Sequence, residues 1–275
     1  MGPDRDNVIF LLGAPGAGKT TLCKNLERTG RFAALSRDEV EAEESALYLE
    51  MQSAFDAVGD DLSWVTVEPL VREYGDRLRA AIDKGVGFIE EMEGFDAGEN
   101  PLRDALKALT SIQDSMMFVA TCVSMNVVRL ISAVTSEAEV LRRVKEYPGS
   151  AVPLVVDNPA LEDPDIRHAL PRVLIENNIK PTLVIMQATR ERLRACAHAR
   201  ANGTAGDEGS VIARPTLDRT LEDIDGNGHI YYPYELWSRV LVLKPKEARH
   251  ADWVSSRLSR ERFEMVTEPI PWIVD

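Results

Sequence analysis

The segment that most constrains the fold is Gly13-Ala-Pro-Gly-Ala-Gly-Lys-Thr20, which follows the apolar run Asn7-Val-Ile-Phe-Leu-Leu12. It satisfies the pattern G-x-x-x-x-G-K-[ST], and Gly16 adds a point at which the backbone can bend tightly around an anion. The amphipathic stretch over residues 20–29 predicts a helix that Gly30 ends. A strand, a glycine-rich turn and a helix in this order bind phosphate, because backbone N–H groups and the helix N-terminus point at the anion.

Each position of this phosphate-binding loop has an expected role. Lys19 brings a full positive charge near the β- and γ-phosphates, and the hydroxyl of Thr20 ligates Mg²⁺. We expect the backbone of the whole segment to wrap the phosphates, which gives the nucleotide-binding set Gly13, Ala14, Pro15, Gly16, Ala17, Gly18, Lys19, Thr20 and Thr21. The sequence therefore predicts a bound nucleotide with Mg²⁺.

The composition suits a soluble, folded chain. Apolar residues make up 44% of the 275 residues, and charged residues make up 28%. No apolar run is long enough to cross a membrane, since the segment from Ser115 to Val128 is short and carries polar residues. The N-terminus lacks the features of a secretory signal, and three cysteines without C-x-x-C spacing indicate reduced thiols. We expect a cytoplasmic protein with no membrane partner.

The formal net charge of -13 opposes sequence-independent attraction to nucleic acid, because phosphate contacts require clustered Lys and Arg. It remains compatible with a local basic groove. A folded cleft can gather Arg142, Arg143 and Lys145 while acidic faces point elsewhere.

Polar residues follow the second predicted strand, residues 31–36. Arg37 and Asp38 stand where that strand should end. Ligands of open parallel sheets bind beyond the carboxyl ends of the strands, so Asp38 is placed for chemistry and Arg37 for substrate binding.

A third strand is predicted over residues 86–95, after a helix over residues 67–84 that Gly85 ends. Side-chain alternation places Glu91 and Glu93 on one side, near the carboxyl end of this strand. We interpret both glutamates as contacts to the acceptor or to Mg²⁺-bound water, with a solvated edge strand as the alternative.

The next segments continue the alternation of strands and helices. Asn100 and Pro101 are typical of a helix start. Residues 127–134 predict a fourth strand, and Thr135-Ser136-Glu137 predicts the start of the helix that follows it. Four prolines between Tyr147 and Pro164 indicate an irregular lid or linker.

A strand over residues 181–187 and a helix over residues 189–200 complete the series. This order predicts an α/β fold, a three-layer sandwich with a parallel sheet. We expect a main domain over residues 1–203, which includes a helical lid at about residues 142–170, and a loop-rich C-terminal appendage over residues 204–275.

The order of these pieces resembles the P-loop kinases, in particular the polynucleotide-kinase-like branch, and more distantly the adenylate and nucleoside monophosphate kinases. The shared features are GAPGAGKTT, the strand end SRDEV, a helix and strand before NPLRDAL, and VVRLISAVTSEAEVLRRV before a lid. The likeness covers roughly Asn7 to Leu170. It implies a P-loop NTPase fold with ATP and Mg²⁺ as cofactors.

In that family a strand-end aspartate acts as the general base toward the acceptor hydroxyl, and lid arginines contact the transferring phosphate. The resemblance therefore implies that Asp38 is the base and that Arg142 or Arg143 is the lid cation. Arg103 matches a family arginine in the N-P-x-R segment and is expected to bind substrate. Two positions depart from the family pattern. Many relatives have an arginine three residues after the aspartate, where this chain has Glu41. Relatives also carry an aspartate at the end of the third strand, whereas the third predicted strand of this chain ends in EEMEGF.

Phosphoryl transfer needs alignment, neutralisation of charge and a group that takes the acceptor proton. A carboxylate such as Asp38 supplies the last of these. Its alternative role is to cap the helix that follows it. The alternative for Arg142 and Arg143 is a solvated helix face.

The sequence thus predicts an ATP-dependent kinase that transfers the γ-phosphoryl group to a hydroxyl acceptor on a nucleoside or nucleic acid, such as a 5′-hydroxyl or a hydroxymethylated base. One alternative is a nucleoside monophosphate kinase. Those relatives carry D-G-F-P-R, in which the arginine binds the acceptor phosphate. This chain has Glu93-Gly-Phe-Asp-Ala97 at that place and lacks the arginine. The second alternative is an NTP-hydrolysing switch without an acceptor, although no guanine-specifying N-K-x-D is present.

The segment from Asp223 to Glu235 resembles the start of an EF-hand loop. Tyr234 occupies the twelfth position, and Glu235 arrives one residue late for bidentate Ca²⁺ binding. A turn rich in Asp, Asn and Gly is therefore favoured over a Ca²⁺ site.

Overall fold

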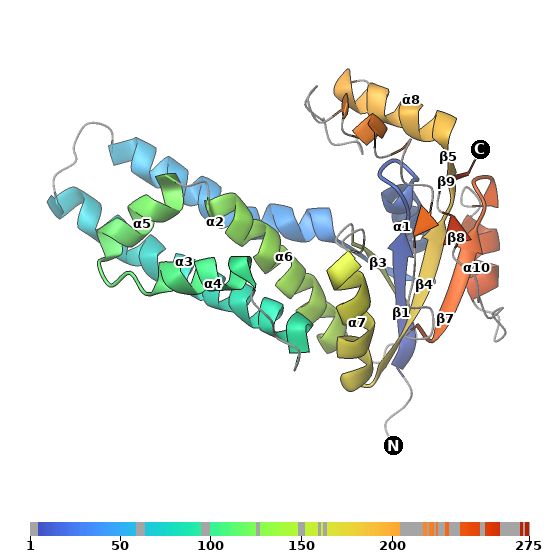
Figure 1. Cartoon of the computed structure of the whole chain (residues 1–275), viewed down its shortest axis with the longest axis horizontal. Helices are drawn as coiled ribbons and strands as arrows, with labels where there is room; N and C mark the ends of the chain where they lie inside the picture. Colours follow the sequence, from blue (N-terminus) through green and yellow to red (C-terminus); the bar gives the residue numbers. More distant parts are fainter. Residues whose placement is uncertain are drawn as a thin grey trace. The chain divides into compact units, whose positions relative to one another are not determined.

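The computed structural model in Figure 1 divides into two compact units, residues 1–36 with 144–275 and residues 37–143. The described residues are 5–58, 64–94, 100–124, 127–147, 152–158, 161, 164–203, 217–218, 220–222, 224, 229–230, 237–247, 251–258, 270–271 and 273–274.

The first unit is built on a five-stranded sheet in which all neighbouring strands run parallel. Its strands, in spatial order, are β2 (Ala33–Ser36), β3 (Leu154–Asp157), β1 (Arg5–Leu12), β4 (Ile179–Met186) and β7 (Arg239–Leu243). Short strand pairs lie outside this sheet: β5 (Ala188–Thr189) with β9 (Ile273–Val274), and β6 (His229–Ile230) with β8 (Ile270–Pro271). The predicted α/β fold with a parallel sheet is confirmed.

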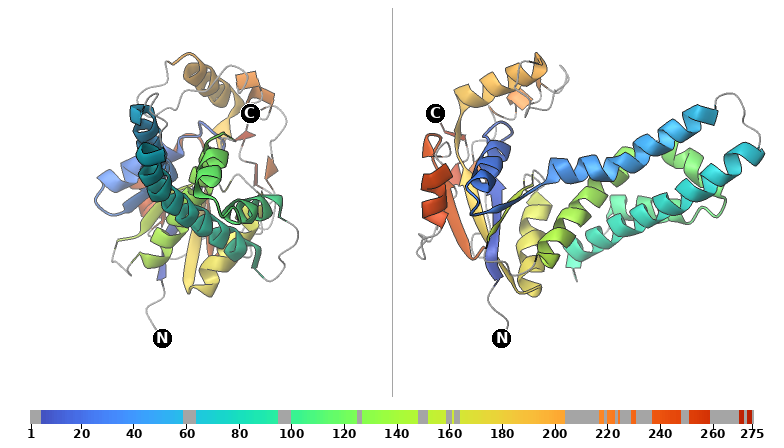
Figure 2. Two further views of the ribbon diagram at one scale, coloured as in Figure 1. Left: turned by 90° about the vertical axis from the view of Figure 1, so that its left-hand side faces the viewer. Right: turned by 180° about the vertical axis from the view of Figure 1, so that it is seen from behind.

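Helices cover both faces of this sheet. The helices of the first unit are α1 (Lys19–Arg28), α7 (Pro164–Glu176), α8 (Arg190–Ala201) and α10 (Ala251–Leu258). Helix α7 covers one face, and α10, which contacts α1, covers the other (Figures 1 and 2). Buried side chains of β1, such as Ile9 and Leu11, share a core cluster with Leu22 and Leu26 of α1. The first unit is therefore a three-layer sandwich.

Strand β7 lies within residues 204–275, the segment predicted as a C-terminal appendage. It pairs with β4 in parallel, from Thr182 opposite Arg239 to Met186 opposite Leu243. Its buried residues Leu241 and Leu243 belong to the same core cluster as β1. The two predicted domains thus share one sheet, and the boundary itself stays a prediction because residues 204–216 lie outside the described residues.

The second unit is helical. Its helices are α2 (Arg37–Val58), α3 (Trp64–Glu93), α4 (Pro101–Thr110), α5 (Ser115–Ser124) and most of α6 (Val127–Glu146). The predicted start of α4 is confirmed, since Asn100 Oδ1 accepts hydrogen bonds from Leu102 N at 3.0 Å and Arg103 N at 3.1 Å. No helix in the described part of the chain is long and apolar enough to cross a bilayer.

The strand predicted over residues 86–95 is wrong, because helix α3 continues to Glu93, and Phe95 lies outside the described residues. Ile82, Val86 and Ile89 are buried at helical spacing. Gly85 does not end the helix. A Cβ at this position would lie 3.0 Å from Val134 Cγ1, so the glycine permits two helices to approach closely.

The strand predicted over residues 127–134 is also wrong, because helix α6 includes it. Val127, Ile131 and Val134 are buried at helical spacing. Thr135 and Ser136, predicted to begin a helix, lie within it. Their hydroxyls donate to the carbonyl oxygen of Ser132 at 3.1 and 2.6 Å, so they bond back to the preceding turn.

The segment from Tyr147 to Pro164, predicted as an irregular lid or linker, contains β3. The strand is buried throughout and pairs with β1 and β2. Four prolines surround these residues without entering the strand, which is why proline content was a poor guide.

Candidate functional site

The loop between β1 and α1 has a backbone that only glycine adopts readily. Gly16 and Gly18 have φ angles of 88° and 98°, in the left-handed region. A Cβ at Gly13 would lie 2.8 Å from the carbonyl oxygen of Met186, so a side chain would collide with the end of β4. Helix α1 begins directly after Gly18, which provides no capping side chain for the first-turn N–H groups. This is the geometry of an anion-binding helix N-terminus.

Lys19 is held inside this loop. The residue is 9% exposed, and Nζ donates a hydrogen bond of 2.6 Å to the carbonyl oxygen of Gly13. The ammonium group thus links the two ends of the loop. From this position it can reach phosphate oxygens bound by the loop.

The next residue contacts a carboxylate from another strand. Thr20 Oγ1 donates a hydrogen bond of 2.6 Å to Asp157 Oδ2. Asp157 is the last residue of β3 and is 4% exposed. The strand register places Asp157 beside Leu11 of β1 and Ser36 of β2, so the carboxyl ends of three strands meet here.

These two residues fit a Mg²⁺ ion bound to a nucleoside triphosphate. In P-loop NTPases the ion is held by the loop hydroxyl and by an aspartate from a neighbouring strand. The remaining ligands are phosphate oxygens and water, since Mg²⁺ retains much of its hydration shell. No group of three His, Cys, Asp or Glu residues suited to a metal ion occurs among the described residues, and a Mg²⁺ site of this kind does not need one.

Sequence reasoning missed Asp157. The available signal was an apolar run, Leu154-Val-Val156, followed by an aspartate, which is typical of a buried strand that ends in a metal-binding carboxylate. The sequence also predicts that the third strand lacks the aspartate that relatives carry at its end, and this prediction is wrong. The third strand in chain order is β3, and it does end in an aspartate.

Helix α8 lies against the glycine-rich loop between β1 and α1. A Cβ at Gly18 would be 3.1 Å from Arg192 Nη2, and one at Gly16 would be 2.9 Å from Cys196 Sγ. Thr189 caps this helix by accepting a hydrogen bond from Arg192 N at 3.3 Å. A guanidinium group therefore lies next to the loop. Sequence reasoning missed it, although Arg192 follows β4, whose carboxyl end lies at the same edge of the sheet.

Asp38 and Arg37 open helix α2, directly after β2. Asp38 is exposed and lies in the first turn of α2, so it does not occupy the residue before the helix that a cap requires. Arg37 Nε donates a hydrogen bond of 3.0 Å to Glu137 Oε1, and Arg37 also pairs with Glu41. The roles predicted for both residues stay predictions.

Glu93 and Arg103 lie together in the second unit, where they form an ion pair. Arg103 also pairs with Asp104 at 3.2 Å. Glu91 lies on the exposed side of α3, not at the end of a strand. The substrate contacts predicted for these three residues therefore stay predictions. For the two glutamates, the prediction relied on a position at the end of a strand, and both residues lie in helix α3 instead.

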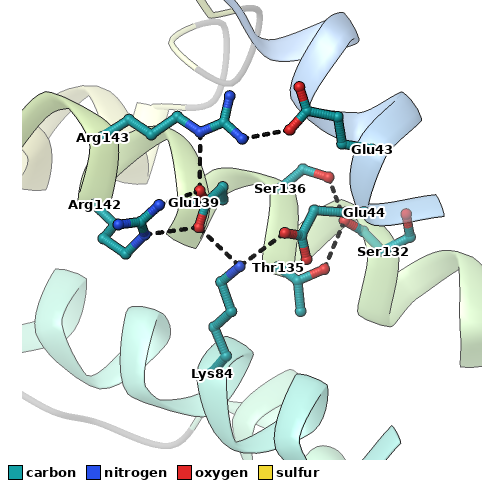
Figure 3. Close-up of polar contacts among 9 residues, drawn as sticks. All are labelled: Glu43, Glu44, Lys84, Ser132, Thr135, Ser136, Glu139, Arg142 and Arg143. Atoms are coloured by element: carbon teal, nitrogen blue, oxygen red, sulfur yellow. Dashed lines mark hydrogen bonds and ion pairs between the residues drawn. The ribbon is translucent and has the colours of Figure 1, made fainter. Parts of the chain in front are cut away.

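Arg142 and Arg143, the predicted lid cations, contact a buried glutamate of their own helix (Figure 3). Arg142 Nη2 lies 2.6 Å from Glu139 Oε1, and Arg143 Nε lies 2.9 Å from the same oxygen. Lys84 of α3 reaches Glu139 Oε2 at 3.1 Å. The hydrogen bonds from Arg142, followed by those from Arg143 and Lys84, hold the pKa of Glu139 well below its usual range, against the effect of burial.

Known proteins offer few matches. No protein-family model matches the chain, and no curated protein matches it. Among solved structures, a candidate kinase from Chloroflexus aurantiacus is similar at 15% identity, over 92% of this chain and 98% of the other, with a TM-score of 0.45. The function is therefore inferred from the residues of this chain alone.

Proposed function

We propose that the protein is an ATP-dependent kinase that moves the γ-phosphoryl group of a Mg²⁺-bound nucleoside triphosphate to a hydroxyl acceptor. The observation that carries this proposal is the hydrogen bond of 2.6 Å between Thr20 Oγ1 and Asp157 Oδ2, beside the glycine loop. A hydroxyl and a buried carboxylate at this position match the protein ligands of Mg²⁺ in P-loop NTPases.

The loop residues bind and orient the triphosphate. The N–H groups at the start of α1 donate to phosphate oxygens, and Lys19 exchanges the Gly13 carbonyl for the β- and γ-phosphates. A bound Mg²⁺ neutralises charge on the same oxygens. Thr20 and Asp157, whose side chains are hydrogen-bonded to each other in this structure, are the residues that would hold the ion.

Asp38 takes the acceptor proton in this proposal. The acceptor oxygen forms a bond to the γ-phosphorus, the bond from that phosphorus to the β-γ bridging oxygen breaks, and ADP leaves with the electron pair. The hydroxyl proton moves to the Asp38 carboxylate. Two observations support this role: Asp38 follows the carboxyl end of β2 by two residues, and it is exposed, with no ion pair among the described residues.

Arg192 is the cation that we propose for the transferring phosphate. Its guanidinium lies beside Gly18 of the loop, and Arg is well suited to bind phosphate oxygens. The lid role predicted for Arg142 and Arg143 is the alternative. Single substitutions of these arginines distinguish the two assignments.

The acceptor predicted from the sequence is a hydroxyl on a nucleoside or nucleic acid, and a nucleoside monophosphate kinase is the alternative. The structure describes neither Phe95 nor residues 96–99, the segment that lacks the acceptor arginine. An NTP-hydrolysing switch remains an outcome of the experiment below.

The test measures ADP release from γ-labelled ATP, with and without candidate acceptors, for the natural protein and for Thr20→Val and Asp157→Asn. The proposal predicts ADP release that depends on acceptor and on Mg²⁺, and a loss of about 10²-fold in each variant. Asp252→Asn on the exposed surface of α10 is the matched control and should keep full activity. Turnover that ignores the acceptor would identify a switch, and unchanged variants would contradict the proposed ion site.

A further inference from the structure

Helix α8 belongs to the sheet unit, residues 1–36 with 144–275, and lies beyond the carboxyl ends of its strands (Figures 1 and 2). It carries Arg192, the cation that we propose for the transferring phosphate. A displacement of about 1 Å is enough to remove most of the benefit of a positioned group. The contacts that fix α8 therefore decide whether Arg192 can serve a bound nucleotide.

One side of α8 packs on the glycine-rich loop. Leu193 is fully buried and shares a core cluster with Ala14 and Ala17 of the loop. On the same side, the thiol of Cys196 lies so close to Gly16 that a Cβ there would be 2.9 Å from Sγ. These contacts are lost if α8 leaves the loop.

The start of α8 is held by a strand from far along the chain. Strand β5, which directly precedes α8, pairs in parallel with β9, with Ala188 opposite Ile273 and Thr189 opposite Val274 (Figure 1). Thr189 is also the residue that caps α8. Strand β9 therefore pairs with the residue at which the helix begins.

A second contact at the same end of α8 comes from Ile224. Arg190, the first residue of α8, donates a hydrogen bond of 2.6 Å from Nη1 to the Ile224 carbonyl oxygen. Ile224 and Ile273 are 3% and 5% exposed, and both belong to the core cluster that contains Leu193 and Ala14. Two points of the segment after residue 203 thus hold one end of this helix.

We propose that Ile224, Ile273 and Val274 form a strap that positions α8, and with it Arg192, on the glycine-rich loop. The inference rests on the proposed function in one respect, the role of Arg192 at the phosphate. It gives residues 204–275, predicted from the sequence as an appendage, a part in controlling that site. The strap acts through α8, so its members are positioning residues.

The strap can open without unfolding the main sheet. The β5–β9 pair is separate from the five-stranded sheet, and each of its strands has two residues. Such short pairs open at a lower cost in free energy than core strands. A nucleotide bound to Arg192 favours the closed strap, and the closed strap raises the affinity for nucleotide by the same factor, because coupling is reciprocal.

The thiol of Cys196 reports the contact between α8 and the loop without any nucleotide. It is half-buried, whereas Cys23 of α1 and Cys122 of the other unit are 2% and 0% exposed. The protein is labelled with N-ethylmaleimide, and the labelling rate of each thiol is measured by mass spectrometry. Cys23 and Cys122 then report wider unfolding in the same sample.

Ile273→Ala tests the strap at β9. It should label Cys196 about tenfold faster while Cys23 and Cys122 keep their natural rates, because only the contact of α8 is loosened. Leu258→Ala, at a buried residue of the same cluster in α10, is the matched control and should leave the Cys196 rate within about twofold. An unchanged Cys196 rate in Ile273→Ala, or equal rates in the two variants, would overturn the inference.

Arg190→Met decides the question if Ile273→Ala exposes all three thiols. It removes the donor to Ile224 and changes no residue of the core cluster. It should label Cys196 about threefold faster or more. Arg194→Met makes the same change on the exposed side of α8 and should label at the natural rate. Equal rates in these two variants would overturn the inference.

A double-mutant cycle tests whether the strap acts through Arg192. Ile273→Ala and Arg192→Ala should each weaken the binding of a fluorescent ATP analogue with Mg²⁺ about fivefold, and the double variant should bind no more weakly than Arg192→Ala. Multiplied effects would overturn the strap alone. Binding that does not depend on Lys19 would instead overturn the proposed function, while the labelling result, obtained without nucleotide, would stand.

Discussion

The two units of this chain handle their charged residues in opposite ways. In the sheet unit, Lys19 is almost fully buried within the glycine-rich loop that we propose binds phosphate, and Arg192 lies beside Gly18. In the helical unit, Lys84, Arg142 and Arg143 converge on Glu139, a carboxylate of the same unit. A cation that already pairs with a carboxylate of the fold is less available to a phosphate than one that contacts only backbone, whatever its position in the sequence.

The largest expected effect comes from the lysine of the sheet unit. Lys19→Ala should lower the rate of phosphoryl transfer by about 10³-fold or more, because it removes the cation that we propose binds the β- and γ-phosphates. Single-turnover transfer of labelled phosphate measures this loss. Lys24→Ala, five residues further along α1, is the control. An equal loss of rate in this variant would contradict a special role for Lys19.

Asp157 tests whether the sheet unit holds the metal ion. Asp157→Asn keeps the size of the side chain and removes its charge, so we expect a rate lower by about 10²-fold and a higher Mg²⁺ requirement. A titration of activity against Mg²⁺ measures both. An unchanged Mg²⁺ dependence would mean that the Thr20–Asp157 contact is only structural.

Asp38 is the residue of the helical unit that we propose as the general base. Asp38→Asn should slow transfer by about 10²-fold with little change in nucleotide affinity, since a general base acts only in the chemical step. Asp56→Asn, on an exposed part of the same helix, serves as the control. If Asp38→Asn transfers phosphate at the natural rate, the residue has no part in the mechanism.

The arginines compare the two units most directly. Arg192→Ala should lower kcat about tenfold or more, because it removes a cation beside the loop. Arg142→Ala and Arg143→Ala should leave kcat within about twofold, since both side chains are engaged with Glu139. The reverse pattern in the same assay would support the lid role predicted from the sequence.

The smallest effect on transfer is expected from Glu139. Glu139→Gln should change kcat less than about twofold but destabilise the helical unit by about 2 kcal/mol, because the buried carboxylate satisfies three cations. The folded pKa of Glu139 is lowered, so this contribution is present above the unfolded pKa and is lost as the pH falls through the folded value. Urea unfolding between pH 7 and pH 3 should therefore show a steeper loss of stability in the natural protein than in the variant, and parallel pH profiles would contradict this.

The sheet unit was well predicted near its loop, because the motif, the preceding apolar strand and the glycine at the helix end agree with each other. Strand β4 and helix α8 were also predicted, with errors of one or two residues in their bounds. Strand β3 was missed because it is only four residues long and lies among prolines. Asp157, the hydrogen-bond partner of Thr20, was missed for the same reason. It is 137 residues from Thr20 in the sequence, and only the sheet register brings the two residues together.

The two strands predicted in the helical unit were wrong for a different reason. β-branched residues such as Val127, Val128 and Ile131 favour strands locally, but packing against other helices overrides that preference. Gly85 was interpreted as a helix end, although it serves close contact with α6. The pairing of Arg142 and Arg143 with Glu139 was within reach of sequence analysis, because their spacings of three and four residues lie on one helix face.

The most direct test of the central claim is a crystal structure of the protein with Mg²⁺ and a non-hydrolysable ATP analogue. The account predicts that the triphosphate lies on the N–H groups of residues 16–20, and that the ion is bonded to Thr20 Oγ1 with Asp157 next to its water molecules. A bound analogue whose phosphates lie away from this loop, or an ion without contact to Thr20, would contradict it.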